Sequence, residues 1–271
     1  MPAPLLLVGC GKMGGALLRG WIGHGVAAAS ITVVEPDASA REQARRAHGV
    51  EAVAAADGLA ADYRPAAVVL AVKPQVMDEV LPPHRRFAET GAVFLSIAAG
   101  RTIASLERHL GREAAIVRAM PNTPAAIGRG ITAACPNEAA GSAQRELCEG
   151  LLAAVGEVVW LEDESLMDAV TAVSGSGPAY VFLLAECLAE AGVEAGLDPD
   201  LAMRLARATV AGSGELLGQA GEAPRMLREA VTSPGGTTEA AVEVLMGDQG
   251  LRSLMSRAVA AAAKRSRALS G

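Results

Sequence analysis

Short apolar runs alternate with longer stretches of helical character over the first part of the chain. The apolar runs occupy residues 5–8, 31–34, 67–72, 92–97 and 114–119. Residues 13–24 and 38–48 are two of the helical stretches between them. Uniformly apolar strands are typical of a sheet covered on both faces, and their alternation with helices predicts a parallel sheet. Two further runs, 131–134 and 158–161, predict late strands.

After about residue 162 the pattern changes to helical spacing alone. The apolar positions of one helix face recur at Leu201, Leu205, Ala208, Gly212 and Leu216. Asp198 and Pro199 supply a cap and a first-turn proline for this helix. Residues 251–268 carry a similar stripe. We therefore predict an α/β, Rossmann-type dinucleotide-binding domain over residues 1–162, followed by an all-α domain over residues 163–271.

Composition narrows the class of protein. The chain has 271 residues, 51% hydrophobic residues, 3% aromatic residues and a net charge of −6. A chain of this length and apolar content can bury the cores of two domains. Nucleic-acid binders need basic patches, and single-strand binders also need aromatic rings for stacking, so we expect no nucleic-acid partner. The four cysteines are scattered without a CxxC pair, so we expect neither disulfides nor a metal site.

The sequence also predicts a soluble, cytoplasmic protein with no membrane partner. The first residues lack the basic region of a signal peptide. Residues 169–185 carry no charge, but this run is shorter than a membrane span and contains two glycines and a proline.

A glycine-rich loop joins the first predicted strand to the first predicted helix. Gly9-Cys10-Gly11-Lys12-Met13-Gly14 fits the G-x-G-x-x-G pattern of dinucleotide-binding loops. Gly9 would allow the tight turn, Gly11 a close approach of the pyrophosphate, and Gly14 the packing of helix on strand. The alternative is a tight turn without a ligand.

The choice between NAD and NADP depends on Glu35, about twenty residues after this loop. An acid here accepts hydrogen bonds from the ribose of NAD and repels the 2′-phosphate of NADP. Arg41 and Arg45 would offset that repulsion if they turned inward, and Glu35 itself could instead point to solvent. Both cofactors therefore stay open at this point.

Three later loops follow predicted strands and should border the cofactor, because ligands bind outside the carboxyl ends of parallel strands. The residues expected there are Ala71, Val72, Lys73, Pro74, Ala98, Ala99, Gly100 and Asn122. The small residues at 98–100 would leave room for the nicotinamide.

A second turn, Ser233-Pro234-Gly235-Gly236-Thr237-Thr238, precedes a predicted helix at 239–246. Free backbone N–H groups at a helix N-terminus favour an anion, and the hydroxyls can bind a ligand as well. A small substrate with a carboxylate beside a polar nitrogen would suit this turn.

Groups for proton transfer are scarce. The four histidines lie outside any motif, in stretches that we expect to be solvated: His24, His48, His84 and His109. No serine or cysteine has a neighbouring base that would make it a nucleophile. Reduction of an imine that is already protonated is a reaction that needs little such machinery.

Several motifs together resemble those of the Δ1-pyrroline-5-carboxylate reductases. They are the loop at 9–14, Ala71-Val-Lys-Pro74, Met120-Pro-Asn-Thr-Pro124, Ser174-Gly-Ser-Gly-Pro-Ala-Tyr180 and the turn at 233–238. This resemblance implies reduction of 1-pyrroline-5-carboxylate to L-proline by NADPH or NADH, the last step of proline biosynthesis. It also implies that the all-α domain binds the substrate and forms a homodimer, with dimers joined into a larger ring such as a decamer.

The resemblance further implies roles for individual residues. The backbone amides of the turn would take the substrate carboxylate, and Thr238, with Ser233, would act at the ring nitrogen. The implied substrate contacts are Ser176, Val231, Ser233, Gly235, Gly236, Thr237, Thr238 and Glu164. Many relatives have a small polar residue in place of Glu35, which puts the usual NADPH preference in doubt.

Two other functions compete with this one. A β-hydroxyacid-type dehydrogenase would share the first loop and a helical second domain, but it needs a lysine as acid and base. The chain has no lysine between Lys73 and Lys264. A non-catalytic dinucleotide sensor would leave the turn at 233–238 without a task.

Overall fold

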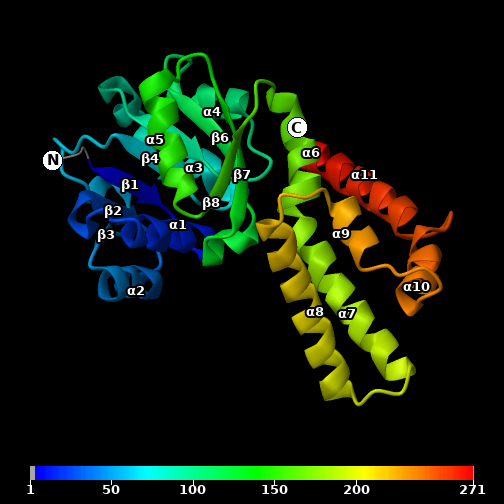
Figure 1. Ribbon diagram of the computed structural model, residues 1–271. Helices are drawn as coiled ribbons and strands as arrows, with labels where there is room; N and C mark the ends of the chain where they lie inside the picture. Colours follow the sequence, from blue (N-terminus) through cyan, green and yellow to red (C-terminus); the bar gives the residue numbers. More distant parts are fainter. Residues whose placement is uncertain (1–3, 271) are drawn as a thin grey trace. The chain divides into compact units, whose positions relative to one another are not determined.

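The computed structural model describes residues 4–270 and divides into two compact units. The sheet unit comprises Met1–Gly175 together with Ala263–Gly271, and the helical unit comprises Ser176–Ala262. Each unit is described by itself below (Figure 1).

The sheet unit is built on eight strands in the order β3-β2-β1-β4-β5-β6-β7-β8. Their bounds are β1 Leu5–Val8, β2 Ile31–Val34, β3 Glu51–Val53, β4 Ala67–Leu70, β5 Val93–Ser96, β6 Ile116–Met120, β7 Gly130–Pro136 and β8 Gly156–Trp160. Neighbouring strands are parallel except β6 and β7. Because β1 lies between β2 and β4, the strand order reverses beside β1, where such sheets bind ligands.

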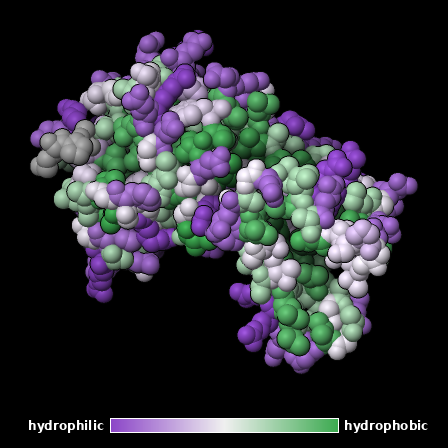
Figure 2. All heavy atoms as spheres, in the orientation of Figure 1, coloured by the Kyte–Doolittle hydropathy of each residue, from purple (hydrophilic) through white to green (hydrophobic). Residues whose placement is uncertain are grey.

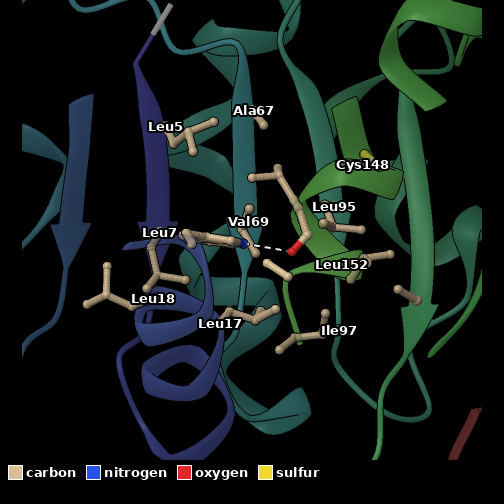
Figure 3. Packing of buried hydrophobic residues seen from close by; sticks show 14 of the residues in the cluster. Leu5, Leu7, Leu17, Leu18, Ala67, Val69, Leu95, Ile97, Cys148 and Leu152 are labelled. Atoms are coloured by element: carbon tan, nitrogen blue, oxygen red, sulfur yellow. Dashed lines mark hydrogen bonds between the residues drawn. The ribbon is translucent and has the colours of Figure 1, made fainter. Parts of the chain in front are cut away.

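Two hydrophobic cores lie on opposite faces of this sheet. Leu5 and Leu7 of β1 belong to the core that includes Leu17 and Leu152 (Figure 3). Leu6 and Val8 alternate with them and belong to the second core. Burial on both faces explains why these strands are uniformly apolar in sequence.

Helices and short turns cover the two faces. The helices of the sheet unit are α1 Lys12–Gly23, α2 Ala38–His48, α3 Met77–Val80, α4 Ile103–Leu110, α5 Ser142–Ala153 and α6 Met167–Val170. Short 3-10 segments include η3 Pro74–Val76, η4 Pro82–Thr90, η5 Thr123–Ile127 and η6 Glu164–Leu166, and η7 Thr171–Gly175 is a π-helical turn. Asp37 caps α2 by accepting a hydrogen bond from the Ala40 N–H at 2.7 Å.

The predicted fold class is confirmed, and each predicted strand is present, the first two with the predicted bounds and the others with shifted ends. The structure adds β3, which the sequence did not predict. Glu51 of β3 is exposed and the strand lies at the sheet edge, so it lacks an apolar run.

The helical unit contains α7 Gly177–Glu194, α8 Pro199–Gln219, α9 Pro224–Ala230, α10 Thr237–Met246 and the start of α11 Leu251–Ser270. Asp198 caps α8 as predicted, by accepting hydrogen bonds from the N–H groups of Asp200 and Leu201. Helices α7 and α8 pack through small residues, since a Cβ on Gly192 would lie 3.3 Å from that of Ala202.

The leucine stripe predicted for α8 is not the face that is buried. Leu201 and Leu205 are 45% and 48% exposed, whereas Ala202 and Ala206 are buried. Small side chains allow close approach of helices, so the alanine face makes the contact within the chain and the leucine face stays exposed.

The chain divides into compact units between Gly175 and Ser176 and again between Ala262 and Ala263, whereas the sequence predicts one domain boundary at 162/163. Residues 163–175 join the sheet unit because Met167 is buried in one of its cores. The helical run from Glu164 to Glu194 is long and apolar enough to cross a membrane by length and composition alone, and 11% of its apolar window is buried. The uncharged run at 169–185 is thus part of a longer helical run. Core helices of soluble proteins can have the same length and apolar composition.

Candidate functional site

The glycine loop after β1 has the geometry of a dinucleotide cradle. Gly9 has a φ of +91°, and a Cβ there would lie 2.9 Å from the carbonyl oxygen of Ala71. A Cβ on Gly14 would overlap with the Gly9 carbonyl oxygen. At Gly11, by contrast, a Cβ would meet nothing within 4 Å among the described residues. The loop is therefore closed where strand and helix pack and open where a ligand would approach.

A cavity of about 500 Å³ opens beside this loop. Its lining comes from the loop, α1, α2 and η5: Cys10, Gly11, Lys12, Gly15, Arg19, Ala40, Gln43, Ala44, His48 and Ala126. Within the described residues, α1 has neither an acidic side chain in its first turn nor a side-chain cap. Free N–H groups and nearby cations fit the pyrophosphate of a dinucleotide.

Seven of the ten lining residues were not identified from sequence, among them the polar residues Arg19, Gln43 and His48. These three lie on helix faces that carry no motif, and only the packing of α1 beside α2 brings them to the loop. The pKa of His48 is lowered, first by burial and then by the positive charge of Arg19. His48 is half-buried in the lining of the cavity, so it is less solvated than the sequence led us to expect.

Glu35 faces the glycine loop rather than solvent alone. Its Oε2 accepts a hydrogen bond from the Cys10 N–H at 2.8 Å, and its Oε1 accepts one from the Asp37 N–H at 3.0 Å. Burial and the Glu35 charge raise the pKa of the Cys10 thiol. The carboxylate is thus fixed at the end of β2, with lone pairs to spare for further donors.

The two arginines after β2 behave differently. Arg41 donates hydrogen bonds to the carbonyl oxygens of Glu35 at 2.7 Å and Pro36 at 2.6 Å, so its charge lies at the end of β2. Arg45 instead donates to the carbonyl oxygen of Ala52 in β3. Only Arg41 is placed to offset the charge of Glu35.

The later predicted cofactor loops follow β4, β5 and β6, at the same edge of the sheet as the glycine loop. Val72 is half-buried beside Gly9, and the exposed Lys73 precedes η3, which starts at Pro74. Ala98 is buried and Ala99 is exposed. Asn122 accepts a hydrogen bond from the Ile131 N–H at 3.0 Å through Oδ1. The parallel strands thereby bring these segments to one edge.

The hydroxyl-rich turn lies in the helical unit, between α9 and α10. The Gly236 N–H donates to the Ser233 carbonyl oxygen at 3.0 Å, with Pro234 second and Gly235 third in the turn at a φ of +70°. Helix α10 then begins at Thr237, and in the part of the chain that the structure describes no side chain caps it. The first N–H groups of α10 are therefore available to an anion.

One predicted donor in this turn is already engaged. The Gly235 N–H donates to Oε2 of Glu239 at 2.7 Å. With Gly236 bonded to Ser233, the donors available at the start of α10, within the described residues, are the N–H groups of Thr237, Thr238 and Glu239. Thr237 is exposed and Thr238 half-buried.

The remaining predicted substrate residues are spread along the chain. Val231 is 64% exposed just after α9, and Ser176 is half-buried at the start of α7, directly after the π-helical turn. Glu164 lies in the sheet unit, where its Oε1 accepts hydrogen bonds from Arg118 at 2.6 Å and from the Ile103 N–H at 2.8 Å. Its carboxylate is thus bound inside the sheet unit, a pairing that no local motif signals.

Comparison with known proteins identifies the family. Residues 164–269 match the family model described as pyrroline-5-carboxylate reductase dimerisation. Residues 5–100 match the model described as NADP oxidoreductase, coenzyme F420-dependent. The pyrroline-5-carboxylate reductase of Pseudomonas aeruginosa is 39% identical over 262 residues, which cover 97% of this chain and 95% of that protein. The chain belongs to the pyrroline-5-carboxylate reductase family.

Other members of the family agree along the whole chain. The pyrroline-5-carboxylate reductase of Synechocystis is 41% identical and covers 99% of both chains. The solved structure of the Coxiella burnetii enzyme has a TM-score of 0.93 and 34% identity, covering 100% of both chains. That of Plasmodium falciparum, described with NADP bound, has a TM-score of 0.83 and 29% identity, covering 99% of this chain and 98% of the other. The resemblance inferred from the motifs is confirmed.

Membership of the pyrroline-5-carboxylate reductase family bears on partners and cofactors. The match over residues 164–269 shows that the chain carries the dimerisation domain of the family, which supports a homo-oligomer through the C-terminal helices. The family is dependent on pyridine nucleotides. Across the described residues 4–270, no three His, Cys, Asp or Glu side chains are grouped to hold a metal ion.

Proposed function

We propose that the protein is a pyrroline-5-carboxylate reductase, which reduces 1-pyrroline-5-carboxylate to L-proline with NADPH or NADH in the last step of proline biosynthesis. The observation that carries the proposal is the uncapped, hydroxyl-rich start of α10 in a chain whose other unit holds an open glycine cradle. The names of relatives that match over the full length support it.

The sheet unit would hold the cofactor. The N–H groups at the start of α1 would bind the pyrophosphate, with Gly11 allowing close approach and Lys12 and Arg19 adding positive charge. Glu35 would accept from a ribose hydroxyl, and the segments at 71–74, 98–100 and 122 would border the rest of the cofactor. Bound NAD(P)H supplies the hydride.

The helical unit would hold the imino acid. The N–H groups of Thr237 and Thr238 would donate hydrogen bonds to the carboxylate. The Thr238 hydroxyl would form a hydrogen bond with the ring nitrogen, with Ser233 beside it. Val231 and Ser176 would complete the contacts. Hydride addition to the carbon of a protonated C=N bond leaves a neutral amine, so positioning and exclusion of water are the main tasks of these residues.

The assembly follows from the same proposal. A homodimer would form through the helical unit, and dimers would join into a larger ring such as a decamer. We place the protein in the cytoplasm as a soluble enzyme, without membrane or nucleic-acid partners. The apolar surface of the run from Glu164 to Glu194 would then contact protein rather than lipid.

An initial-rate comparison tests the activity. We expect purified protein to oxidise both NADPH and NADH in the presence of pyrroline-5-carboxylate, and to leave both cofactors unchanged with the keto forms of 3-hydroxyacids. Turnover with the keto acids alone would support a β-hydroxyacid-type dehydrogenase. Cofactor binding without any turnover would support a non-catalytic sensor, and either result would overturn the proposal.

A further inference from the structure

The loop between β5 and α4, residues 97–102, is fastened by residues from three distant segments. Asp78 of α3 pairs with Arg101 and accepts a hydrogen bond from His109 at 2.9 Å. The Ile103 N–H, where α4 begins, donates to Glu164 at 2.8 Å. The last turn of α11 packs on Gly100, where a Cβ would lie 3.3 Å from the carbonyl oxygen of Leu269.

Two of these contacts come from opposite ends of the C-terminal region. Glu164 begins the segment that matches the dimerisation model and Leu269 ends it. A hydrogen bond joins the two ends, because the Ser266 hydroxyl donates to Oδ1 of Asp168 at 2.6 Å. We call Glu164, Asp168, Ser266 and Leu269 the C-terminal clasp. All four belong to the sheet unit.

The hydrogen-bonded part of the clasp is largely shielded from water, whereas Leu269 is 59% exposed. Ser266 is 6% exposed, and Glu164 also pairs with Arg118, whose side chain is 7% exposed. Hydrogen bonds to a charged acceptor are stronger than neutral ones, and they weaken less where water is excluded. Gly100 has a φ of +74°, a backbone conformation that residues with a side chain rarely adopt. The absence of a side chain also lets the last turn of α11 approach closely.

We propose that the C-terminal clasp positions the loop at 97–102 for hydride transfer, with Ser266 and Leu269 as positioning residues. This inference rests on the proposed function, in which residues 98–100 border the nicotinamide. The clasp leaves the adenosine side of the cofactor to the glycine loop and the cavity between α1 and α2. Loss of the clasp should therefore impair the chemical step while dinucleotide affinity from the adenosine side is retained.

Ser266→Ala tests the clasp directly, with Ser165→Ala as its matched control. Ser165 donates its hydroxyl to Asp163 at 2.6 Å but is exposed and lies outside the clasp. We expect Ser266→Ala to lower kcat about tenfold, since small misplacements of reacting groups have effects of this size or more. The primary deuterium isotope effect on kcat, with cofactor labelled at the transferred position, should rise, and the Kd for ADP-ribose should stay unchanged. Ser266→Thr, which keeps the hydroxyl, should restore activity.

A second variant keeps the inference open to refutation if Ser266→Ala does not fold. A chain that ends after Ala268 removes the contact of Leu269 with Gly100 and keeps the buried hydroxyl, and we expect the same loss of kcat and rise in isotope effect. Unchanged kcat and isotope effect in folded variants would overturn the clasp. A fall in ADP-ribose affinity parallel to kcat would also overturn it, because a general loss of folding does that. Absence of imine turnover by the unaltered chain would instead refute the proposed function.

Discussion

The sheet unit and the helical unit bury their side chains to very different extents. Leu7 and Phe94 of the sheet are fully buried, as are most large apolar residues of that unit. Among the described residues of the helical unit, the buried hydrophobic side chains are Ala189, Ala202 and Ala206. Phe182 of α7 is 62% exposed, and Figure 2 shows hydrophobic surface over α7 and α8.

The sheet unit therefore has a complete core in a single chain, and the helical unit does not. Large exposed apolar patches mark interaction sites, and obligate interfaces resemble a core cut in half. The dimerisation match covers the region that leaves its leucines exposed. The second copy of the chain is therefore expected to supply the core that the helical unit lacks.

The largest effect should come from a charge in this exposed face. Phe182→Glu buries a carboxylate if α7 enters the dimer interface, so we expect the dimer to dissociate and activity to be lost. Light scattering coupled to size-exclusion chromatography measures the change in mass. Val159→Glu, on the edge strand β8, is the matched control, because Val159 is also an exposed apolar residue but lies in the complete unit. Equal masses for both variants would remove the contrast between the units.

The same contrast explains how much of the fold the sequence predicts. Strands buried on both faces, such as β1, are apolar throughout and are found from one short run. In α8 the leucine stripe gives the right period, yet the alanines make the contact within the chain. The exposed β3 has no such signal. Which face of a helix is buried depends on its partner, and that partner can be another chain.

In the candidate site, local backbone requirements are predictable and long-range partners are not. The glycines at 9 and 14 are found because strand and helix meet there, and Pro234-Gly235 is found because it is a turn. The pairing of Glu164 with Arg118 spans 46 residues and depends on the sheet order. The hydrogen bond from the Gly235 N–H to Glu239 spans only four residues, and there it is the orientation of the Glu239 side chain that the sequence does not predict.

Thr238→Ala should have the next largest effect, and it tests whether the helical unit binds the substrate while the sheet unit binds the cofactor. If the helical unit holds the substrate, the loss of this hydroxyl should lower kcat about ten- to a hundredfold, within the range of a single acid–base group. The Kd for NADPH, measured by fluorescence titration, should not change. Thr232→Ala is the control, because that hydroxyl is engaged with the Arg228 carbonyl oxygen at 2.7 Å. A weaker Kd in Thr238→Ala would assign this threonine to the cofactor instead.

A smaller effect is expected from Glu35, which lies in the sheet unit. Glu35→Ser removes the charge at the end of β2, so the ratio of kcat/KM for NADPH to that for NADH should rise about tenfold, equivalent to about 1.4 kcal/mol. Glu35→Gln keeps an oxygen for the Cys10 N–H while removing the charge, and it should raise the ratio too. If kcat/KM falls equally for NADPH and NADH in Glu35→Ser but not in Glu35→Gln, the role of Glu35 is to support the glycine loop and not to select the cofactor.

Substitution of His84 should have the smallest effect, on stability rather than activity. The structure also corrects the expectation that this histidine is solvated. Its side chain lies in η4 beside Phe87 and is 2% exposed. Nδ1 donates to the Val80 carbonyl oxygen at 2.8 Å, and in the described part of the chain Nε2 has no partner. Burial, with the nearby Arg86 charge, lowers the pKa of His84 below its ordinary 6.5.

A lowered pKa in the folded state fixes the sign of the pH dependence. Below pH 6.5 the unfolded chain binds a proton that folded His84 does not, so the free energy of unfolding should fall, by at most about 1.4 kcal/mol per pH unit for one group. Asp78, whose pKa is lowered by Arg101, loses its contribution to stability only below about pH 3.8.

His84→Asn keeps a donor for Val80 but does not titrate, and urea unfolding between pH 7 and 5 should show a shallower fall in the free energy of unfolding. The pKa of His48 is lowered as well, so part of the slope should remain. His24→Asn, where an exposed imidazole bonds the Gly20 carbonyl oxygen at 2.9 Å, is the matched control and should keep the full slope. Identical slopes in all three proteins would show that water or a local opening reaches His84, and that this part of the sheet unit is less complete than its burial indicates.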